Sequence, residues 1–526
     1  MQQTTLKLAP YDVGAMDLKR PPDEDFAWPC AFSTIVPELR QQIRRYSDFA
    51  AKLDDSIERA VVLGAFAVLN PIQGLLEAAL YLDSEKAAGI RLDGSNWQLE
   101  YLRSGRIDDQ SSPPLCANLL SFPARSSFNL LRNIKVTASM NGLGFPASLV
   151  NPTATALSIN PLISSAILQP GNRVRFAYAT SFLDQSQAAP AKSPYSIDGK
   201  GLARRLASYL MEGWNLGDAT RERLYFLVEK ECRHALSTVS EDLGQLSTIS
   251  KLPDVLWSGT GGHYIYRLLG VEQIRRGNLI RRFAHGAMPT LLMERSELAQ
   301  LNEFAVSSEF VFSSSRFLDV IRQIGTLDNV PENLSCTFNY SEAGHKRTNS
   351  PVKEKTPRTR RRVLYAPTLP RGFGRYGMPD LRETVYIDWR MKLINQLNKM
   401  PIDLVVKFHP AETRSGFSHY LPEGVETTLA PFEEILDDVD VVVFDYFKSS
   451  TIPTTLSTDK PVVLIDIDNS DFRPTIRFEL DKRCRLITGE YDSNNLPCVD
   501  QDVLEEAVCS GQGSADPEFF QSIYQC

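Results

Sequence analysis

The sequence predicts an α/β protein with two doubly wound, Rossmann-like domains and extra helices ahead of the first. Strand-like apolar runs alternate with helix-like segments in two separate stretches, 253–315 and 361–467. Such alternation is typical of a parallel sheet covered by helices. The 526 residues also exceed what a single hydrophobic core usually serves. We therefore expect two sheets, with ligands bound at the carboxyl ends of their strands.

Composition limits the class of protein. With 43% hydrophobic and 23% charged residues, the chain is expected to be globular. Its net charge of -7 argues against nucleic-acid binding, because such domains usually carry a basic excess. The eight cysteines include no CxxC pair, so neither a zinc site nor a disulfide framework is indicated. Reduced thiols in a cytoplasmic protein are the simplest interpretation.

The first half of the chain shows helical and strand-like patterns. Residues 37–84 have helical periodicity, and Pro71 is expected in the first turn of a helix. The apolar run 60–69 is about half of what a membrane span requires, and we interpret it as a buried helix. The start of the chain lacks the pattern of a secretory signal. Short runs at 89–94, 133–139 and 173–182 predict strands, and 200–247 predicts helix.

A basic segment separates the two predicted domains. From residue 346 to 362 it holds eight Lys or Arg and one Glu, so it cannot contribute to a core. Two roles stay open: contact with an anionic membrane surface on its cytoplasmic face, or a solvated tether, which is the commoner one. The predicted division is a lead-in segment 1–36, an acceptor domain 37–340 with helical insertions, a linker 341–362 and a nucleotide-donor domain 363–526.

Three segments of the second domain place polar groups at strand ends. The first is VVKFHP, in which Lys407 and His409 follow a continuous apolar run. The second is YAPT, ending at Thr368, whose following loop carries Arg371 and Arg375. Taken alone, His409 is more readily a structural polar residue. Because these strands belong to one predicted sheet, their ends are expected to converge on one crevice.

The third segment is KSST, which follows the strand DVVVFD directly. Hydroxyl groups and free backbone N–H groups at a helix start, with a lysine beside them, suit an anion. The same residue types also cap ordinary helices. The candidate residues are Lys448, Ser449, Ser450 and Thr451.

The order YAPT, KFHP, DVVVFD with SST, and KPVVLID resembles the C-terminal domain of GT-B glycosyltransferases of surface polysaccharide synthesis. These include CMP-sugar-dependent sialyltransferases and Kdo transferases, and CDP-glycerol glycerophosphotransferases. The resemblance implies that His409 contacts the donor phosphate and that Ser449, Ser450 and Thr451 hold it. The stretch FDYFKSS departs from the TDYSS-like pattern of the glycerophosphotransferases, which disfavours CDP-glycerol and leaves the phosphate-binding serine open.

The first domain resembles the same enzymes more loosely, through SGTGGHYIYRLLG and the later AHG. Gly259, Gly261 and Gly262 would allow a ligand close to the backbone, with His263 and His285 nearby. Turn glycines and structural histidines are the alternative interpretation.

The resemblance also implies an acidic general base in an Asp/Glu-Asp/Glu-Gly motif of the first domain. Only partial matches occur, at Asp93 and Asp198; Asp93 is preferred because it follows an apolar run, and His285 is the other candidate. We expect transfer without a metal or a cofactor, because His409, Lys407 and the helix start after Ser450 suit the departing phosphate and the nucleotide-sugar is a substrate.

The predicted function is inverting transfer of a nonulosonate or Kdo-like sugar from a CMP donor to a surface polysaccharide or glycolipid. Polyol-phosphate transfer from a CDP donor is the nearest alternative, and an epimerase acting on UDP-sugars is a weaker one. A non-catalytic nucleotide-binding subunit is the alternative from another class.

Overall fold

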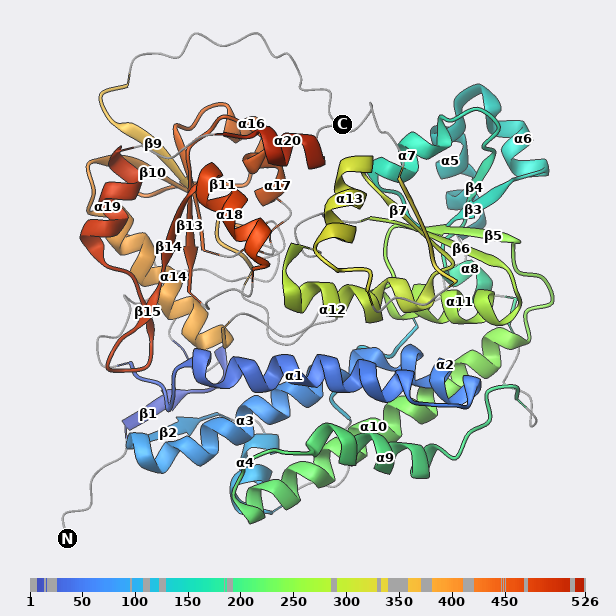
Figure 1. The fold of residues 1–526 in the computed structure, drawn as a ribbon, viewed down its shortest axis with the longest axis horizontal. Helices are drawn as coiled ribbons and strands as arrows, with labels where there is room; N and C mark the ends of the chain where they lie inside the picture. Colours follow the sequence, from blue (N-terminus) through green and yellow to red (C-terminus); the bar gives the residue numbers. More distant parts are fainter. Residues whose placement is uncertain are drawn as a thin grey trace.

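The computed structural model covers the whole chain and places two parallel sheets above a layer of helices (Figure 1). It describes residues 7–524 except for 14–15, 17–25, 95–96, 107–113, 123–128, 184, 187–192, 285–290, 329–332, 339–357, 370–380, 410–420, 446, 448, 450, 468–471 and 511–515.

The first sheet has six parallel strands in the order β4-β3-β5-β6-β7-β8. Numbered along the chain, this is the doubly wound order 2-1-3-4-5 with a sixth strand at the edge. The helices that follow β5 and β6 are the predicted ones, whereas the helix that follows β7 was not predicted. The strands are β3 (Ala154–Ala156), β4 (Val174–Phe176), β5 (Val255–Ser258), β6 (Leu279–Phe283), β7 (Glu309–Phe312) and β8 (Ser335–Phe338), and the helices are α7 (Pro161–Ile167), α8 (Thr180–Leu183), α11 (Tyr264–Arg275), α12 (Met293–Asn302) and α13 (Ser315–Gln323).

The second sheet has six parallel strands in the order β11-β10-β9-β12-β13-β14. This is the Rossmann order 3-2-1-4-5-6, whose direction reverses between β9 and β12. The predicted fold class, two Rossmann-like α/β domains with extra N-terminal helices, is therefore confirmed. The elements are β9 (Arg361–Tyr365), α14 (Glu383–Asn398), β10 (Ile402–Lys407), β11 (Glu426–Thr428), α16 (Phe432–Leu436), β12 (Val441–Phe444), α17 (Thr451–Leu456), β13 (Val462–Asp466), α18 (Pro474–Arg483), β14 (Arg485–Thr488), β15 (Glu490–Tyr491), β16 (Pro497–Cys498), α19 (Gln501–Ser510) and α20 (Glu518–Tyr524).

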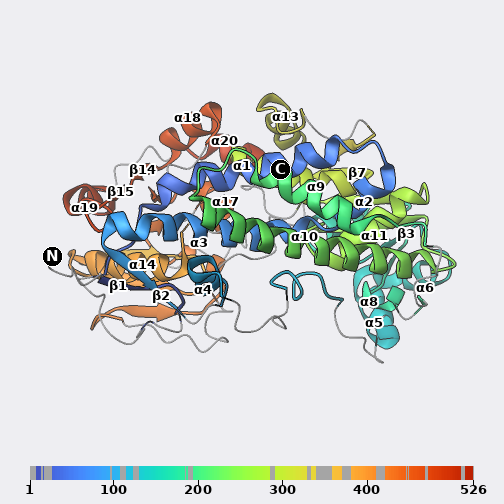
Figure 2. The same cartoon turned by 90° about the horizontal axis from the view of Figure 1, so that it is seen from below.

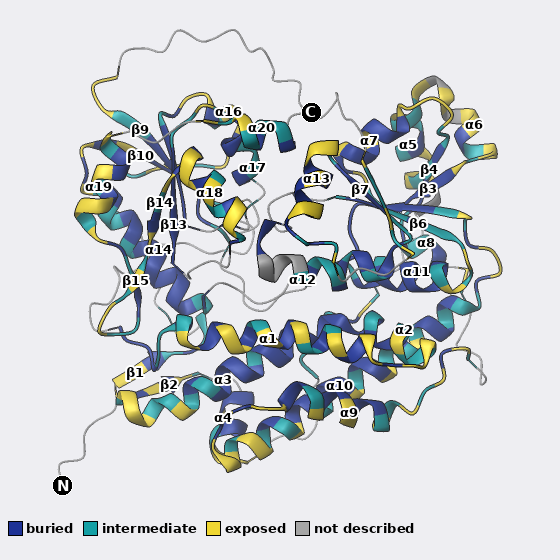
Figure 3. Ribbon diagram, viewed as in Figure 1, coloured by how far each residue is buried: buried dark blue, intermediate teal, exposed yellow. Residues whose placement is uncertain are grey.

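A layer of long helices runs under both sheets and shares a core with them (Figures 1 and 2). Residues of α3, α10 and α14 belong to one apolar cluster. Figure 3 shows that the central strands of both sheets and much of α14 are buried. Pro71 lies in the first turn of α3, as predicted. The layer consists of α1 (Phe32–Ala51), α2 (Ser56–Gly64), η2 (Phe66–Val68), α3 (Leu69–Ala88), α4 (Trp97–Ser104), α9 (Gly199–Met211) and α10 (Asp218–Ser247).

The apolar run 60–69 is buried within this layer, as predicted, but it bends at Ala65 between α2 and η2. No single helix in the described part of the chain has the length and apolar composition to cross a membrane. The bent pair Ser56–Gly64 with Phe66–Ala88 meets those criteria by length and composition alone.

Segment 133–139 is not a strand; it lies in helix α5 (Asn129–Asn141), which precedes η3 (Gly142–Gly144) and α6 (Phe145–Val150). The polar residues Asn133, Thr137 and Asn141 recur every four positions and therefore share one helix face. They bond the backbone of edge strand β4 at alternate residues: Asn133 Oδ1 accepts from Tyr178 N (2.9 Å), and Thr137 Oγ1 accepts from Phe176 N (2.9 Å). Asn141 Nδ2 donates to the Val174 backbone oxygen (2.8 Å), so this helix covers the edge of the sheet. The β-branched residues of the helix explain why its sequence resembles a strand.

The strand predicted at 89–94 exists as β2 (Ile90–Asp93), but it belongs to neither main sheet. It pairs in parallel with β1 (Lys7–Pro10) beside the helical layer. The strand predicted at 173–182 is limited to β4, because α8 begins at Thr180. Strands β3, β8, β11 and β14 were not predicted; three of them form sheet edges, and β3 lies next to one.

Direct contacts join the sheet-bearing halves. The last helix, α20, packs on both: Ser314 Oγ at the start of α13 donates to the Ile523 oxygen (3.0 Å), and Gln521 Nε2 donates to the Ser457 oxygen beyond α17 (3.1 Å). Leu292 and Phe472 form an isolated antiparallel bridge between the two halves. The helical layer thus does not act as the sole link between the sheets.

Candidate functional site

The three polar segments of the second domain end three adjacent strands. Strand β9 lies between β10 and β12, so the ends of YAPT, KFHP and DVVVFD are successive along one edge of the sheet. Neighbouring strands lie about 4.8 Å apart. The expected convergence of these strand ends is therefore present, and it lies at the point where the strand order reverses.

Asp445 forms the centre of this edge. It follows β12 directly and only 2% of it is exposed. Its Oδ2 accepts hydrogen bonds from the Tyr365 hydroxyl at 2.6 Å and from Trp389 Nε1 at 3.1 Å, and its Oδ1 accepts from the Tyr386 hydroxyl at 3.3 Å. Burial raises the pKa of Asp445, and the three donors oppose that shift. The carboxyl group therefore fixes three large side chains at the end of the sheet.

One face of helix α14 reaches all three strand ends. Tyr386, besides contacting Asp445, accepts a hydrogen bond from the Thr368 backbone N–H at 3.0 Å. Trp389 contacts Asp445, and the Arg390 guanidinium lies 5.4 Å from the ring centre of Phe408. These residues are three and four positions apart, so they lie side by side on the helix. The helix thus holds the loop after β9, the end of β10 and the end of β12 in one arrangement.

Lys407 and His409 are two basic residues at this edge. Lys407 ends β10 and is half-buried, while His409 is exposed. Partial burial lowers the pKa of Lys407, against an opposing effect of Glu433. Phe408 between them packs toward Arg390, so Lys407 and His409 project from a supported turn.

Of the KSST segment, Ser449 and Thr451 are described, whereas Lys448 and Ser450 lie outside the described residues. The Ser449 and Thr451 hydroxyl oxygens are 2.7 Å apart, and the Thr451 N–H donates to Ser449 Oγ at 3.4 Å. Helix α17 begins at Thr451, as predicted. Ser449 therefore contacts the first residue of this short helix, at the same sheet edge as Thr368.

The glycine loop of the first domain has its backbone donors already engaged. Gly259 N–H donates to Ser158 Oγ (2.7 Å), Gly261 N–H to Glu303 Oε2 (2.5 Å), and Gly262 N–H to Thr260 Oγ1 (3.0 Å). A Cβ at Gly261 would lie 2.1 Å from the Asn302 carbonyl oxygen. The predicted close approach is therefore made by the protein's own backbone and carboxylate.

Buried charge reinforces this loop. The fully buried Arg282 donates through Nη1 to the Thr260 oxygen at 2.6 Å. Burial raises the pKa of Glu303, while Arg282, the Gly261 N–H and Arg267 lower it. Arg267, also buried, donates to the Leu301 oxygen at 2.9 Å. The loop between β5 and α11 is thus anchored to the end of α12.

The candidate general bases are not brought together by the described structure. Asp93 is exposed at the end of β2, where its backbone oxygen accepts from Tyr11 N–H at 2.7 Å. Asp198 caps α9, with Oδ1 accepting from Gly201 N–H at 3.0 Å. His285 lies outside the described residues, two positions after the end of β6. His263 precedes α11, with its ring centre 5.2 Å from that of Tyr266.

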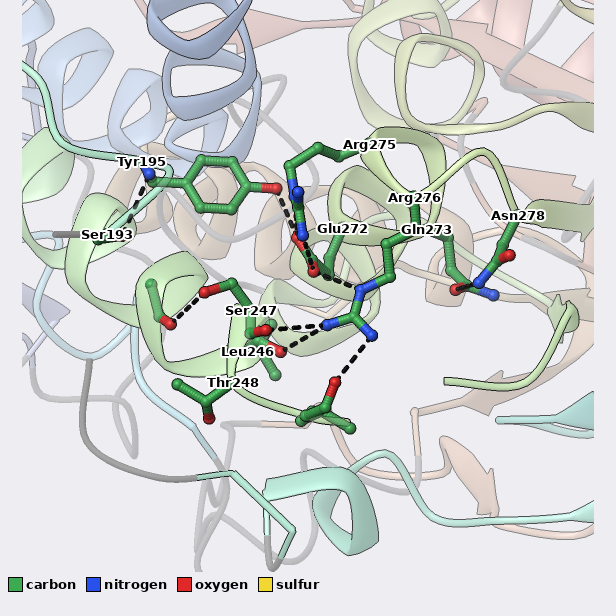
Figure 4. Close-up of polar contacts among 12 residues, drawn as sticks. Ser193, Tyr195, Leu246, Ser247, Thr248, Glu272, Gln273, Arg275, Arg276 and Asn278 are labelled. Atoms are coloured by element: carbon green, nitrogen blue, oxygen red, sulfur yellow. Dashed lines mark hydrogen bonds and ion pairs between the residues drawn. The ribbon is translucent and has the colours of Figure 1, made fainter. Parts of the chain in front are cut away.

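Figure 4 shows a polar network at the amino end of the first sheet, opposite the glycine loop. Glu272, near the end of α11, accepts from the Tyr195 hydroxyl at 2.7 Å and pairs with Arg275 and Arg276. Burial alone would raise the pKa of Glu272, but the hydrogen bonds from these three residues lower it. Arg276 also donates to the Ile249 oxygen at 2.8 Å, beyond α10. This network secures the packing of helices.

No group of three or more His, Cys, Asp or Glu side chains gathers as a metal site within the part of the chain that is described. The seven described cysteines are free thiols. Of the basic linker, the structure describes the last few residues, where Arg358 pairs with Asp438 at 2.5 Å and Arg362 with Glu426 at 2.5 Å.

Comparison with known proteins gives a distant structural likeness. No protein-family model and no curated protein matches the chain. The glycotransferase of kitacinnamycin superimposes with a TM-score of 0.36 at 15% identity, covering 71% of this chain and 94% of that one. A variant of the wall teichoic acid polymerase TagF gives 0.33 at 10% identity, covering 75% and 92%. A UDP-glucosyltransferase from Polygonum tinctorium gives 0.35 at 9%, covering 71% and 92%. TM-scores this low do not establish a shared fold, which rests here on the two strand orders.

Proposed function

We propose that the chain is an inverting glycosyltransferase that moves a nonulosonate or Kdo-like sugar from a CMP donor to a surface polysaccharide or glycolipid acceptor. The observation that carries the proposal is the edge of the second sheet. There, one face of α14 and the buried Asp445 hold the ends of YAPT and KFHP at the reversal of strand order. A nucleotide binds at this position in Rossmann-type sheets.

In this proposal, the exposed His409 and the half-buried Lys407 stabilise the departing phosphate. Cationic groups fixed beside a leaving group lower the barrier because they need not reorganise during the reaction. The supported turn at Phe408 supplies that fixed geometry. Ser449 and Thr451 follow β12, which is separated from β10 by β9, and they would contact the nucleotide through their hydroxyls.

Transfer also requires a base that accepts the proton of the acceptor hydroxyl. Asp93 lies on a separate two-stranded pair and outside both main sheets. His285 follows the carboxyl end of β6 within the first domain. We therefore favour His285 as the base in this mechanism.

Isothermal titration with CMP tests the nucleotide site. We expect CMP to bind, and His409→Ala to weaken binding about tenfold or more, since a hydrogen bond to a charged group contributes about 1.5–3 kcal/mol. His234→Ala, on α10, is the matched control and should leave affinity unchanged. A well-folded protein that binds no CMP would refute the proposal.

The rival enzyme function is polyol-phosphate transfer from a CDP donor, which uses the same cytidine contacts. Phosphorus in the isolated product separates the two, because sugar transfer from CMP leaves the phosphate on the nucleotide. CMP binding without transfer from any donor would instead identify a non-catalytic nucleotide-binding subunit.

A further inference from the structure

A cavity of about 330 Å³ lies between the helical layer and the start of α14, apart from the residues assigned to the nucleotide. One wall is a stripe of α3 that includes Gly74, Leu75 and Ala78. Leu99 of α4 and Leu119 of a nearby turn supply further apolar lining. The volume falls within the usual range for small-molecule sites.

The cavity is preformed because its walls are held by buried groups. Small side chains at Gly74 and Ala78 leave the space beside α3. The turn that carries Leu119 is fixed by Glu231 of α10, whose carboxylate accepts from Leu115 N–H at 2.9 Å and Cys116 N–H at 3.0 Å. Glu231 is itself only 3% exposed. The turn therefore cannot simply collapse into the cavity.

Arg382 supplies the charged group of the lining. Its Nε and Nη2 donate to the backbone carbonyl oxygen of Tyr11 at 3.3 Å and 3.2 Å, and its Nη1 donates to Glu77 Oε2 at 3.3 Å. The guanidinium lies 3.7 Å from the Tyr11 ring centre. An arginine has five N–H donors. These contacts leave one N–H on Nη1 without a hydrogen-bond acceptor among the described residues, while Nη2 also forms an ion pair with Asp12 Oδ1 at 3.7 Å.

Local charge decides what that donor can bind. Arg382 is balanced by the buried Glu77 and by Asp12, whose oxygen lies 3.7 Å from Nη2. An additional anion would therefore be repelled, whereas a neutral acceptor oxygen would not be. The other polar lining groups, the Gln98 and Asn118 amides, are also uncharged.

We propose that this cavity binds a mainly apolar, uncharged small molecule whose carbonyl oxygen accepts a hydrogen bond from Arg382. An apolar body gains from leaving water, and a few polar groups fix its orientation. The proposal goes beyond the nucleotide site and does not depend on it.

The test uses the full-length protein and two fluorescent probes, the carbonyl compound propionyl-dimethylaminonaphthalene and its carbonyl-free parent dimethylaminonaphthalene. We expect saturable one-to-one binding, with the carbonyl compound at least tenfold tighter. Ala78→Phe fills the cavity and should weaken both probes at least tenfold without lowering Tm. Leu131→Asp, at an exposed leucine of α5, should change neither affinity.

The charge-balanced double variant Arg382→Met with Glu77→Gln should bind the two probes equally. Unchanged probe binding in Ala78→Phe would overturn the proposal, as would an undiminished carbonyl preference in the double variant. If the double variant does not fold, Ala78→Phe alone decides. CMP affinity measured in Ala78→Phe should equal that of the parent protein, so failure here and failure at the nucleotide site are separate results.

Discussion

Both sheets have a buried carboxylate near the carboxyl ends of their strands, but the carboxylates contact different groups. At the first sheet, the amides of the glycine loop bond Ser158, Glu303 and Thr260, so the protein's own side chains occupy the donors. At the second, the buried Asp445 binds the aromatic side chains beneath the edge, while His409 remains exposed and Lys407 half-exposed. The protein's own groups thus occupy the loop at the first edge, whereas the second edge keeps basic side chains that are exposed or half-exposed.

The difference shows where a buried carboxylate has its effect. Glu303 sits at the loop itself and uses the backbone donors that a phosphate would need. Asp445 does not contact the loop directly. It accepts a hydrogen bond from Tyr386, which in turn accepts one from the Thr368 N–H, so the carboxylate positions the loop through a side chain. We infer that changes at the first edge should alter Tm alone. At the second edge, a change should also alter nucleotide affinity if it removes the support of the Thr368 loop.

The largest effect is expected from Gly261→Ala. The new Cβ would lie 2.1 Å from the Asn302 backbone oxygen, which cannot rotate away as a side chain could. Overpacking of this kind costs about 3 kcal/mol, which lowers the Tm of a domain this size by about 6–12 °C. Thermal unfolding followed by fluorescence measures it, and CMP affinity of the folded variant should be unchanged.

Gly144→Ala is the matched control, because nothing lies within 4 Å of the Cβ it would gain. It should shift Tm by less than about 2 °C. A Gly261→Ala protein with normal Tm and tenfold weaker CMP binding would reverse the comparison, because it would place the nucleotide on the glycine loop.

An intermediate effect is expected from a pair of hydroxyl deletions around Asp445. Tyr386→Phe removes the acceptor of the Thr368 N–H as well as a donor to Asp445. It should cost about 2 kcal/mol of stability and weaken CMP binding about tenfold, because the loop after β9 loses its anchor. Tyr365→Phe removes the 2.6 Å bond to Asp445 but leaves Thr368 held.

Tyr365→Phe should therefore lower stability by a similar amount with CMP affinity nearly unchanged. Calorimetric titration and thermal unfolding of both variants provide the measurement. Equal losses of CMP affinity in the two variants would contradict a specific role of the Tyr386 contact with the loop.

Periodicity in the sequence was sufficient to predict that two sheets exist, together with the helices α11, α12, α14, α16 and α17, because long apolar runs bounded by glycine and proline leave few alternatives. It failed where tertiary contacts decide. Helix α5 contains β-branched residues, yet its polar spacing of four serves strand β4. The edge strands β8 and β11 are short and partly polar, so their patterns are weak.

The sequence predicted the strand ends of the candidate site, but it did not predict that Asp445 and helix α14 hold them in place. KFHP and YAPT were identified because polar residues follow apolar runs. Asp445 was taken as part of a strand, and the helix YIDWR was not linked to the site, because contacts between a helix face and three separate loops depend on the fold. The one available signal was two aromatic residues and an arginine, Tyr386, Trp389 and Arg390, at helical spacing in a buried helix.

The smallest effect is expected from the pH dependence of stability at Asp242, beside the glycine loop of the first sheet. Asp242 of α10 accepts a 2.5 Å hydrogen bond from Tyr264, the residue that starts α11 just after the glycine loop. Burial raises the pKa of Asp242 to about 6, against the lowering effect of the Tyr264 hydrogen bond. The unfolded chain releases this proton near pH 4. Between about pH 4 and pH 6 the folded state thus holds more protons, so this group makes stability fall as pH rises.

Asp242→Asn removes that dependence and keeps an oxygen that accepts from Tyr264. Because Asp242 is partly exposed to solvent, its ionisation costs only about 1 kcal/mol above pH 6. We expect the variant to gain about 2–4 °C in Tm at pH 8 and to match the parent at pH 4. Glu241→Gln, at the exposed neighbouring position, should give nearly the same Tm difference at both pH values. A constant difference for Asp242→Asn would instead mean that the carboxyl group does not change charge in this interval, and that packing at the start of α11 determines its contribution.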